Sequence, residues 1–231
     1  MKDIYQINSE ILELLNNKGF VVIDKILNDE ECKTIISMYN DPILFRKTIV
    51  MERYRFGAGE YKYFTYPLPE IIQQLREKLY QLLYPVANSW FKALNIDVQF
   101  PETHKEFIKV CNASNQTLAT PLILKYGVGG HNTLHQDLYG DVYFPLQAVV
   151  FLNKPGDDYT GGEFVMTEQI PRAQSKAIVL NPNQGDTLIF TTQFRPQKGT
   201  KGHYRVNMKH GVSEIYSGER HTLGIIFHDA K

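Results

Sequence analysis

Hydrophobic residues recur at helical spacing in the first half of the chain. Apolar positions there lie three to four residues apart, which is the spacing of an amphipathic helix. Asn28 and Glu31 match a capping box at the start of one such segment. We expect Pro85 to break or kink another, because proline lacks a backbone donor and clashes with the preceding turn. The predicted helices cover 4–15, 28–40, 67–95 and 104–112.

Short strand-like segments dominate after residue 120. Apolar or alternating stretches follow one another there, and Gly, Pro, Asn and Asp separate them. This rhythm is typical of an antiparallel sandwich or barrel. Earlier in the chain, the β-branched segment 19–27 predicts a strand, and 48–64 predicts two strands around a Gly57–Gly59 turn.

These patterns predict one domain over 1–231, mainly β with N-terminal helices (α+β). Residues 1–118 would form a helical buttress and the first strands, and 119–231 would form the β core. The chain is 43% hydrophobic and 22% charged, as folded globular proteins are. Its formal net charge of zero gives no global attraction to nucleic acid or to an anionic membrane, so any such attraction needs a local patch.

The sequence carries no pattern for export or for membrane insertion. No apolar run approaches the roughly 20 residues of a membrane span, and the N-terminus lacks the apolar stretch of a signal peptide. The two cysteines, Cys32 and Cys111, lie far apart and do not indicate a disulfide framework. We therefore expect a cytoplasmic protein with no membrane partner.

A candidate metal site begins with His135 and Asp137 in the segment NTLHQDLYG. Side chains two residues apart on a strand point to the same face, so both could reach one point. A second histidine from a distant strand would complete a 2-His-1-carboxylate set. Such a set leaves three octahedral positions open and is characteristic of non-haem Fe(II) oxygenases. The pair alone is weak evidence for a metal site, because most His-x-Asp pairs lie at the surface or in loops.

His210 is the preferred third ligand. It opens a predicted strand, and Arg220 follows ten residues later, after a Ser217-Gly218 turn. His221 has the opposite parity to Arg220 and should face away. The other histidines lie in loops, in polar or basic stretches, or near the chain end: His104, His131, His203 and His228.

Arg220 and Thr222 are predicted to share one face of the last strand. A guanidinium group matches a carboxylate in a bidentate fashion, and a neighbouring hydroxyl can add another hydrogen bond. This pair therefore predicts a site for a carboxylate ligand. The alternative is that Arg220 pairs with Glu214 or Glu219 at the surface.

The order of these motifs resembles the 2-oxoglutarate/Fe(II) dioxygenase superfamily, and within it the prolyl-hydroxylase-like branch. Segments such as RFGAGEYKYFTYPLP, HQDLYG and GERHTLGIIFHDA are similar to a bacterial family of 2-oxoglutarate oxygenases that has been linked to alkylated DNA. The resemblance covers roughly residues 19–230. The matching order is Tyr126, His135-x-Asp137, YFPLQAVVFLN, GGEF, GDTLIF, His210-Gly-Val and Arg220-x-Thr222.

The resemblance implies a double-stranded β-helix (jelly-roll) core and a hydroxylation of a C–H bond that is coupled to oxidative decarboxylation of 2-oxoglutarate. It implies that the metal-binding and catalytic set, His135, Asp137 and His210, holds Fe(II). It also implies that Arg220 binds the distal carboxylate of 2-oxoglutarate, with Thr222 and Tyr126 as helpers. Ordinary strand packing is the alternative role for Tyr126. Oxygen is then the other co-substrate, and ascorbate is a candidate for keeping the iron reduced.

Two basic groups bear on the substrate. The run from Arg195 to Lys209 contains no acid, and its members Arg205 and Lys209 are candidates for contact with an anionic substrate. A solvated hairpin that blunts a sheet edge is the alternative. The second group is aromatic and basic, and its members are Arg53, Arg55, Tyr61, Tyr63 and Phe64. These side chains could stack on nucleic-acid bases, with Arg55 as a substrate contact, or they could pack an ordinary hairpin.

Three functions therefore stay open. The chain could hydroxylate a protein side chain or a small molecule, it could demethylate alkylated nucleic acid, or it could be a non-catalytic, cupin-like barrel that binds a metal or ligand. The histidines and the carboxylate would suit all three, but Arg220 favours the two oxygenases, because a binding module has no need of a carboxylate-binding arginine at that place.

Overall fold

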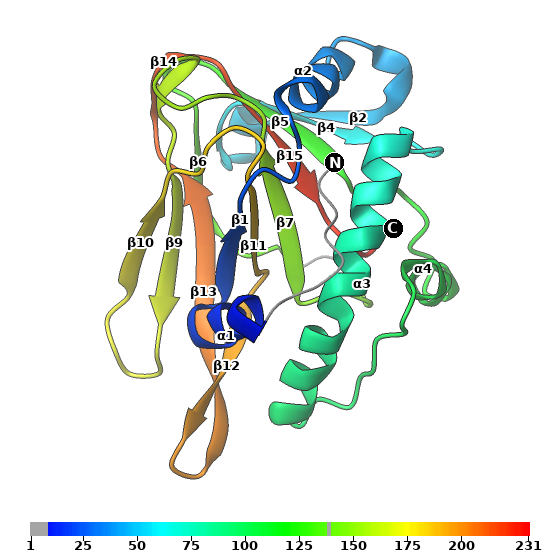
Figure 1. The fold of residues 1–231 in the computed structure, drawn as a ribbon, viewed down its shortest axis with the longest axis vertical. Coiled ribbons are helices and arrows are strands. Elements are labelled where there is room, and N and C mark those ends of the chain that lie inside the picture. The colour runs from blue at the N-terminus through cyan, green and yellow to red at the C-terminus, as the bar shows by residue number, and fades with distance from the viewer. Residues whose placement is uncertain (1–8, 138–139) are drawn as a thin grey trace.

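The computed structural model describes residues 9–137 and 140–231, and its strands pair in antiparallel fashion into two main sheets (Figure 1). The strands are β1 Phe20–Ile23, β2 Phe45–Val50, β3 Gly57–Ala58, β4 Glu60–Phe64, β5 Leu122–Tyr126, β6 His131–His135, β7 Leu146–Phe151, β8 Tyr159–Gly161, β9 Phe164–Gln169, β10 Lys176–Leu180, β11 Thr187–Thr191, β12 Phe194–Gly199, β13 Gly202–Val212, β14 Ile215–Gly218 and β15 Arg220–Ile225. The helices are α1 Ser9–Lys18, α2 Asp29–Met38, α3 Glu70–Ala93 and α4 His104–Ala113, with 3-10 turns η1 Pro42–Leu44 and η2 Met51–Tyr54.

The larger sheet has the order β1-β11-β7-β15-β5-β4-β2, and the smaller has the order β10-β9-β13-β6-β3 with β12 beside β13. Their inner faces pack together through a cluster that takes side chains from both sheets, such as Phe190 and Phe164. Burial of these alternating apolar positions drives the two sheets together. The expected mainly β fold with added helices is confirmed.

Helix α3 covers the outer face of the larger sheet (Figure 1), and its apolar stripe joins the main core with strand residues such as Ile123 and Leu223. The expected break at Pro85 is wrong, because α3 continues through that residue. Burial of Leu83, Val86 and neighbouring side chains against the sheet outweighs the one backbone hydrogen bond that proline removes. None of the helices in the described ranges is long and apolar enough to cross a membrane.

The predicted capping box of α2 is confirmed. The Asn28 side chain accepts from the Glu31 backbone N–H at 2.9 Å, and the Glu31 carboxylate accepts from the Asn28 N–H at 2.9 Å. The fourth predicted helix is also present, as α4. The first predicted helix, 4–15, falls partly outside the described residues, and α1 runs on to Lys18.

The predicted turn at Gly57–Gly59 is wrong. Turn η2 makes the connection instead, and Gly57 lies in β3, where it pairs with Asn132 of β6. A Cβ atom on Gly57 would lie 2.2 Å from the His131 carbonyl oxygen, and its φ is +137°. Glycine is therefore needed here for the close approach of β3 to β6, rather than for a reversal of the chain.

The basic run forms the β12–β13 hairpin, in which Gly199 pairs with Gly202 around the tip. This agrees with the hairpin alternative. The expectation that His210 opens a strand is wrong, because it lies near the end of the eleven-residue strand β13. Strand β13 instead runs without a break from the hairpin tip to the histidine.

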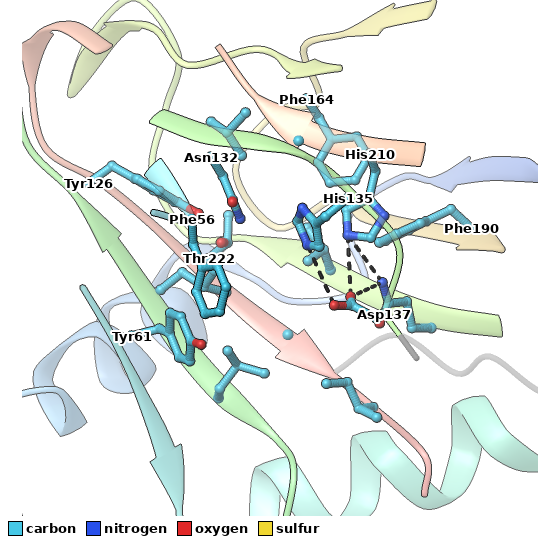
Figure 2. A pocket seen from close by; sticks show the side chains of 18 of the residues that line it. Phe56, Tyr61, Tyr126, Asn132, His135, Asp137, Phe164, Phe190, His210 and Thr222 are labelled. Atoms are coloured by element: carbon cyan, nitrogen blue, oxygen red, sulfur yellow. Dashed lines mark hydrogen bonds and ion pairs between the residues drawn. The ribbon is translucent and has the colours of Figure 1, made fainter. Parts of the chain in front are cut away.

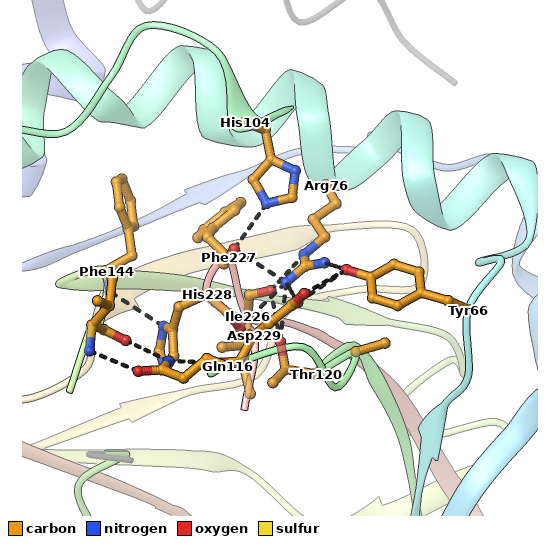
Figure 3. A network of polar contacts seen from close by, with 12 residues as sticks. Tyr66, Arg76, His104, Gln116, Thr120, Phe144, Ile226, Phe227, His228 and Asp229 are labelled. Atoms are coloured by element: carbon orange, nitrogen blue, oxygen red, sulfur yellow. Dashed lines mark hydrogen bonds and ion pairs between the residues drawn. The ribbon is translucent and has the colours of Figure 1, made fainter. Parts of the chain in front are cut away.

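A buried polar network ties α3 to the segment that follows β15 (Figure 3). The Arg76 guanidinium donates to the Asp229 carboxylate at 2.8 Å and to the Tyr66 hydroxyl at 2.8 Å. It also donates to three successive backbone carbonyls, those of Ile226, Phe227 and His228. This network fixes the end of β15, a strand that starts in the cavity described next.

Candidate metal centre

His135 and His210 are cross-strand neighbours in the smaller sheet. His135 ends β6, and His210 lies directly opposite it on β13. Asp137 follows β6 by two residues, and its carboxylate oxygens lie 3.5 Å from His135 Nε2 and 3.3 Å from His210 Nε2. Figure 2 shows the three side chains converging on one point, and their donor atoms all lie within 4.8 Å of one another.

Neighbouring groups hold the two imidazoles in place. His135 Nδ1 lies 2.7 Å from the Thr133 carbonyl oxygen and donates to it, because a carbonyl only accepts, so Nε2 is the ring nitrogen that faces Asp137. The His210 ring lies parallel to Phe164, with 5.8 Å between ring centroids, and edge-on to Phe190. Both rings are therefore oriented before any ligand arrives.

The chain between His135 and Asp137 and the Asp137 carboxylate are also held in place. The Gln136 side chain donates to the backbone carbonyls of Gln193 and Met208, at 3.0 and 2.9 Å. The Gln147 side chain on β7 donates to Asp137 Oδ2 at 2.7 Å. These amides stabilise the chain direction after β6 and the orientation of the carboxylate.

The charges of this cluster suit a metal cation. Burial acts to raise the pKa of Asp137, but hydrogen bonds from His135 and His210 outweigh it and hold that pKa well below its usual range. Burial lowers the pKa of His210, with Asp137 opposing, which favours the neutral imidazole that binds metals. Two imidazole nitrogens and one carboxylate oxygen form the 2-His-1-carboxylate donor set, which fits Fe(II) and leaves three octahedral positions open.

Arg220 begins β15 and points into the same cavity. Its side chain is 1% exposed, and none of its three guanidinium nitrogens has a hydrogen-bond partner among the described residues. The guanidinium carbon lies 5.2 to 6.0 Å from the ring centroids of Phe151, Tyr126 and Tyr159. A buried cation without an acceptor is costly, so this pocket is suited to an anion.

The surface ion pair considered for Arg220 is not formed. Glu219 instead pairs with Lys125 at 2.8 Å, and Glu214 is exposed while Arg220 is buried. The orientation of Arg220 toward the cavity follows from strand parity. Its neighbour His221 points the other way, as predicted, and its backbone N–H and ring contact Asn153.

Tyr126 and Thr222 lie beside Arg220 as the sequence suggested. Tyr126 pairs with Arg220 across β5 and β15, and Thr222 follows on the same face. The Tyr126 hydroxyl is buried and has no hydrogen-bond partner among the described residues. Burial raises the pKa of Tyr126 to about 12 although Arg220 acts to lower it, so the hydroxyl is a neutral donor. Both hydroxyls can thus serve the ligand of Arg220.

One cavity of about 360 Å³ joins the histidine cluster and Arg220. Figure 2 shows Phe56 and Tyr61 on one side of it and Phe164 and Phe190, around His210, on the other. Phe56, Asn132 and Gln147 also line the cavity and were not predicted from the sequence. Only Gln147 carried a usable signal, since it is a polar residue inside the apolar run YFPLQAVVFLN.

The candidate substrate contacts divide into two cases. Arg205 and Lys209 alternate with the buried residues Val206, Met208 and His210 along β13, so they lie on its opposite face and do not line the cavity. The Arg205 guanidinium packs over Phe194, 4.6 Å from the ring centroid. Arg55 is exposed and lies next to Phe56 at the cavity.

Comparison with known proteins places the chain. The family model described as an oxygenase catalysing oxidative methylation of damaged DNA matches residues 59–230. The chain belongs to this oxygenase family. Two strains of Mycobacterium tuberculosis have relatives, the uncharacterized proteins Rv2227 and MT2286, and each is 44% identical over 167 residues, which are 72% of this chain and 72% of the relative.

Solved structures confirm the double-stranded β-helix fold of this oxygenase. A prolyl-4-hydroxylase from Pseudomonas putida has a TM-score of 0.54 at 13% identity and covers 96% of this chain and 98% of its own. A prolyl hydroxylase from Trichoplax adhaerens scores 0.55 at 16% identity, covering 95% and 87%. A 2OG-Fe(II) family oxidoreductase from Burkholderia pseudomallei scores 0.52 at 12% identity, covering 98% and 95%.

The family and the fold agree with the chemistry of the cavity. The family model identifies an oxygenase, and the donor set of the cavity is one that suits Fe(II). The non-catalytic barrel is therefore set aside. The described residues contain one group of His, Cys, Asp or Glu donors spaced to hold a metal ion, the cluster of His135, Asp137 and His210.

Proposed function

We propose that His135, Asp137 and His210 hold the Fe(II) of this oxygenase and that Arg220 binds the distal carboxylate of 2-oxoglutarate. The observation that carries this proposal is the buried guanidinium of Arg220, which has no hydrogen-bond acceptor within the described ranges and faces the same cavity as the three donors. A dicarboxylic acid would supply the missing charge and still have a free end for the metal. Thr222 and Tyr126 would add hydroxyl donors to the same carboxylate.

The bound iron, with 2-oxoglutarate and oxygen, supplies the oxidation of a C–H bond, and the protein residues supply orientation and shelter. Arg220 and its aromatic walls fix one end of the co-substrate away from water. The His210 side chain is deeply buried, whereas the His135 side chain is 33% exposed. The substrate therefore approaches from the His135 side, past Phe56.

Turnover of 2-oxoglutarate tests the assignment. The purified protein with Fe(II) should convert 2-oxoglutarate to succinate, measured with and without ascorbate. His210→Ala should lose both iron binding, measured by metal content, and succinate formation. His131→Gln is the matched control, because His131 lies on the same strand as His135 and does not line the cavity. Full metal content in His210→Ala would refute the assignment.

For the substrate, we propose an alkylated base in nucleic acid. The description of the family, which names damaged DNA, and the aromatic lining of the cavity support this class. Hydroxylation of an N-methyl carbon consumes one oxygen and one 2-oxoglutarate and yields succinate and CO2. The hydroxymethyl product then releases formaldehyde and leaves the N–H base.

Parallel reactions separate this substrate from a protein side chain or a small molecule. Methylated oligonucleotides should stimulate succinate formation and release formaldehyde in a one-to-one ratio, and unmethylated ones should release none. Stimulation by a peptide pool or a metabolite pool with no response to methylated oligonucleotides would replace the nucleic-acid substrate. It would leave the iron and 2-oxoglutarate assignment in place.

A further inference from the structure

Two aromatic rings stand exposed beside the cavity mouth. Tyr54 is 53% exposed and Phe56 is 46% exposed, and the rings stack with 5.5 Å between centroids and 19° between planes. Phe56 lines the cavity and Tyr54 does not, so the stack leads from the cavity toward solvent. Large apolar side chains are normally buried, and an exposed, ordered pair beside a cavity indicates a contact surface.

The segment that presents the rings is fixed rather than loose. Met51 anchors turn η2 in the core with no exposed surface, and the Phe56 N–H donates to the Met51 carbonyl at 3.2 Å. The Phe56 carbonyl accepts from both the backbone N–H and the hydroxyl of Thr133, each at 2.9 Å. A preorganised surface loses little conformational entropy when a ligand binds.

The same segment carries positive charge that no acidic side chain of the described ranges neutralises. Arg53 and Arg55 are exposed, and neither makes an ion pair with a described residue. The nearby Glu52 carboxylate accepts from the Gly59 N–H at 3.2 Å. A ligand that fits this surface has a flat π-face for the rings and negative charge for the guanidinium groups, and a nucleotide unit combines both.

We propose that Tyr54 and Phe56 form a stacking platform for one unpaired base of a nucleic-acid strand, next to the base that enters the cavity, and that Arg53 and Arg55 contact its phosphates. This inference rests on the nucleic-acid substrate proposed above. In a duplex both faces of a base are already stacked, so the platform takes single strands, or a base that has left its pair. It thereby sets the strand preference of the oxygenase.

Binding of unmethylated oligonucleotides tests the platform separately from the chemistry. The iron-loaded protein is titrated without oxygen against a short fluorescent deoxyoligonucleotide, its ribonucleotide counterpart and its duplex, and anisotropy is recorded. The wild type should bind single strands more tightly than the duplex, and the first two probes decide between DNA and RNA. Equal or tighter binding of the duplex would overturn the platform.

Variants of Tyr54 show whether stacking is responsible. Tyr54→Ala and Tyr54→Leu should each weaken single-strand binding about ten-fold, and Tyr54→Trp should preserve it. Tyr216→Ala is the matched control, because Tyr216 is 67% exposed on β14 and does not line the cavity. It should bind as the wild type does. Wild-type affinity in Tyr54→Ala or Tyr54→Leu would overturn the proposal.

Salt dependence tests the charges. Arg53→Gln should reduce the slope of log Kd against log salt by about 0.7 for a single strand, the amount expected for one phosphate contact. An unchanged slope in both Arg53→Gln and Arg55→Gln would show that neither guanidinium group contacts a phosphate. Tighter binding of an acidic, aromatic peptide than of the oligonucleotide would replace the nucleobase with a protein ligand.

Basal succinate formation from 2-oxoglutarate without any substrate keeps the two proposals apart. Tyr54→Ala should retain it. If the wild type forms succinate and Tyr54→Ala binds oligonucleotides normally, the platform alone is refuted. If the wild type forms no succinate while Tyr54→Ala binds oligonucleotides weakly, the catalytic assignment is refuted and the platform stands.

Discussion

Two buried arginines serve this protein in opposite ways. Arg76 has 0% exposure and Arg220 has 1%, so both guanidinium groups are removed from water. Arg76 has the Asp229 carboxylate and several carbonyls as acceptors, whereas Arg220 has none among the described residues. Burial alone therefore does not indicate a functional arginine; the missing acceptor does. A structural cation is paired with a negative charge of the protein itself, whereas a ligand-binding cation is paired only when the ligand supplies that charge.

Removal of the structural arginine should have the largest effect on folding. Arg76→Met leaves the buried Asp229 carboxylate unpaired, so we expect the free energy of unfolding to fall by about 3–5 kcal/mol. Urea denaturation measures the change. Adding Asp229→Asn to Arg76→Met should recover part of the loss, because the unpaired charge is then gone. Equal stability of Arg76→Met and the wild type would show that Arg76 has no structural role, and the two arginines would then no longer differ in this way.

Removal of the ligand-side arginine should instead act on the co-substrate. Arg220→Met should raise the KM for 2-oxoglutarate about 100-fold or more, because a charge-assisted bidentate contact is lost, while iron content stays normal. Its unfolding midpoint without ligand should match or exceed that of the wild type, since an unpaired charge is removed. A destabilisation as large as that of Arg76→Met would show that Arg220 has a structural acceptor.

Acidification should weaken the Arg76 side of the protein. Burial and then Arg76 lower the pKa of His104 to about 3 and that of His228 to about 4. Their ordinary pKa is near 6.5, so the unfolded chain binds these protons first as the pH falls. Stability is complete above about pH 6.5 and declines below it, by about 2 kcal/mol for each imidazole at about pH 5.

Denaturation at several pH values measures this decline. His104→Phe removes one titrating group from the aromatic cluster around Tyr80 and should flatten the pH dependence, although it also loses the contact of His104 with the Phe227 carbonyl. The matched control is His203→Phe, the same substitution at an exposed histidine of β13. A pH dependence that survives in His104→Phe without any reduction would contradict the role of this imidazole.

The smallest predicted effect concerns Gln147, whose side chain contacts the Asp137 carboxylate in the cavity that Arg220 also lines. Gln147→Leu removes the donor that holds Asp137 Oδ2, and we expect iron affinity to fall about ten-fold. The midpoint for iron in a competition with a chelator measures the change. The control is Gln169→Leu, because Gln169 is exposed at the end of β9. Equal midpoints for Gln147→Leu and Gln169→Leu would show that Asp137 is positioned without this amide.

Short-range rules accounted for much of the site. The two-residue spacing predicted the pair His135 and Asp137, whereas His210 was predicted from its place before Arg220 and from the family resemblance; the structure brings the three together. The same parity rule would also have removed Lys209 from the substrate side, since adjacent residues on a strand face opposite ways. The positive charge of Lys209 and its place beside His210 suggest a substrate contact, but its direction on β13 rules it out.

Long-range contacts account for most of what the sequence did not predict. Arg76 is one of several charged residues in a helical pattern, and nothing local indicates that Asp229 will meet it. Gly57 is used for an approach to β6, a strand about seventy residues away that the local pattern cannot supply. Tyr54 and Phe56 carry apolar rings that a sequence pattern assigns to a core.

The direct pairing of His135 with His210 also links sheet assembly to iron. A shift of β13 by one residue against β6 would turn the imidazole outward and bring Lys209 or Gly211 to its place. If these residues hold the iron as proposed, a chain paired in the wrong register cannot bring the three ligands together and is not stabilised by the metal. Iron binding would then stabilise only the correctly paired fold, and chains that fold without iron would spend longer with β13 and β6 in the wrong register.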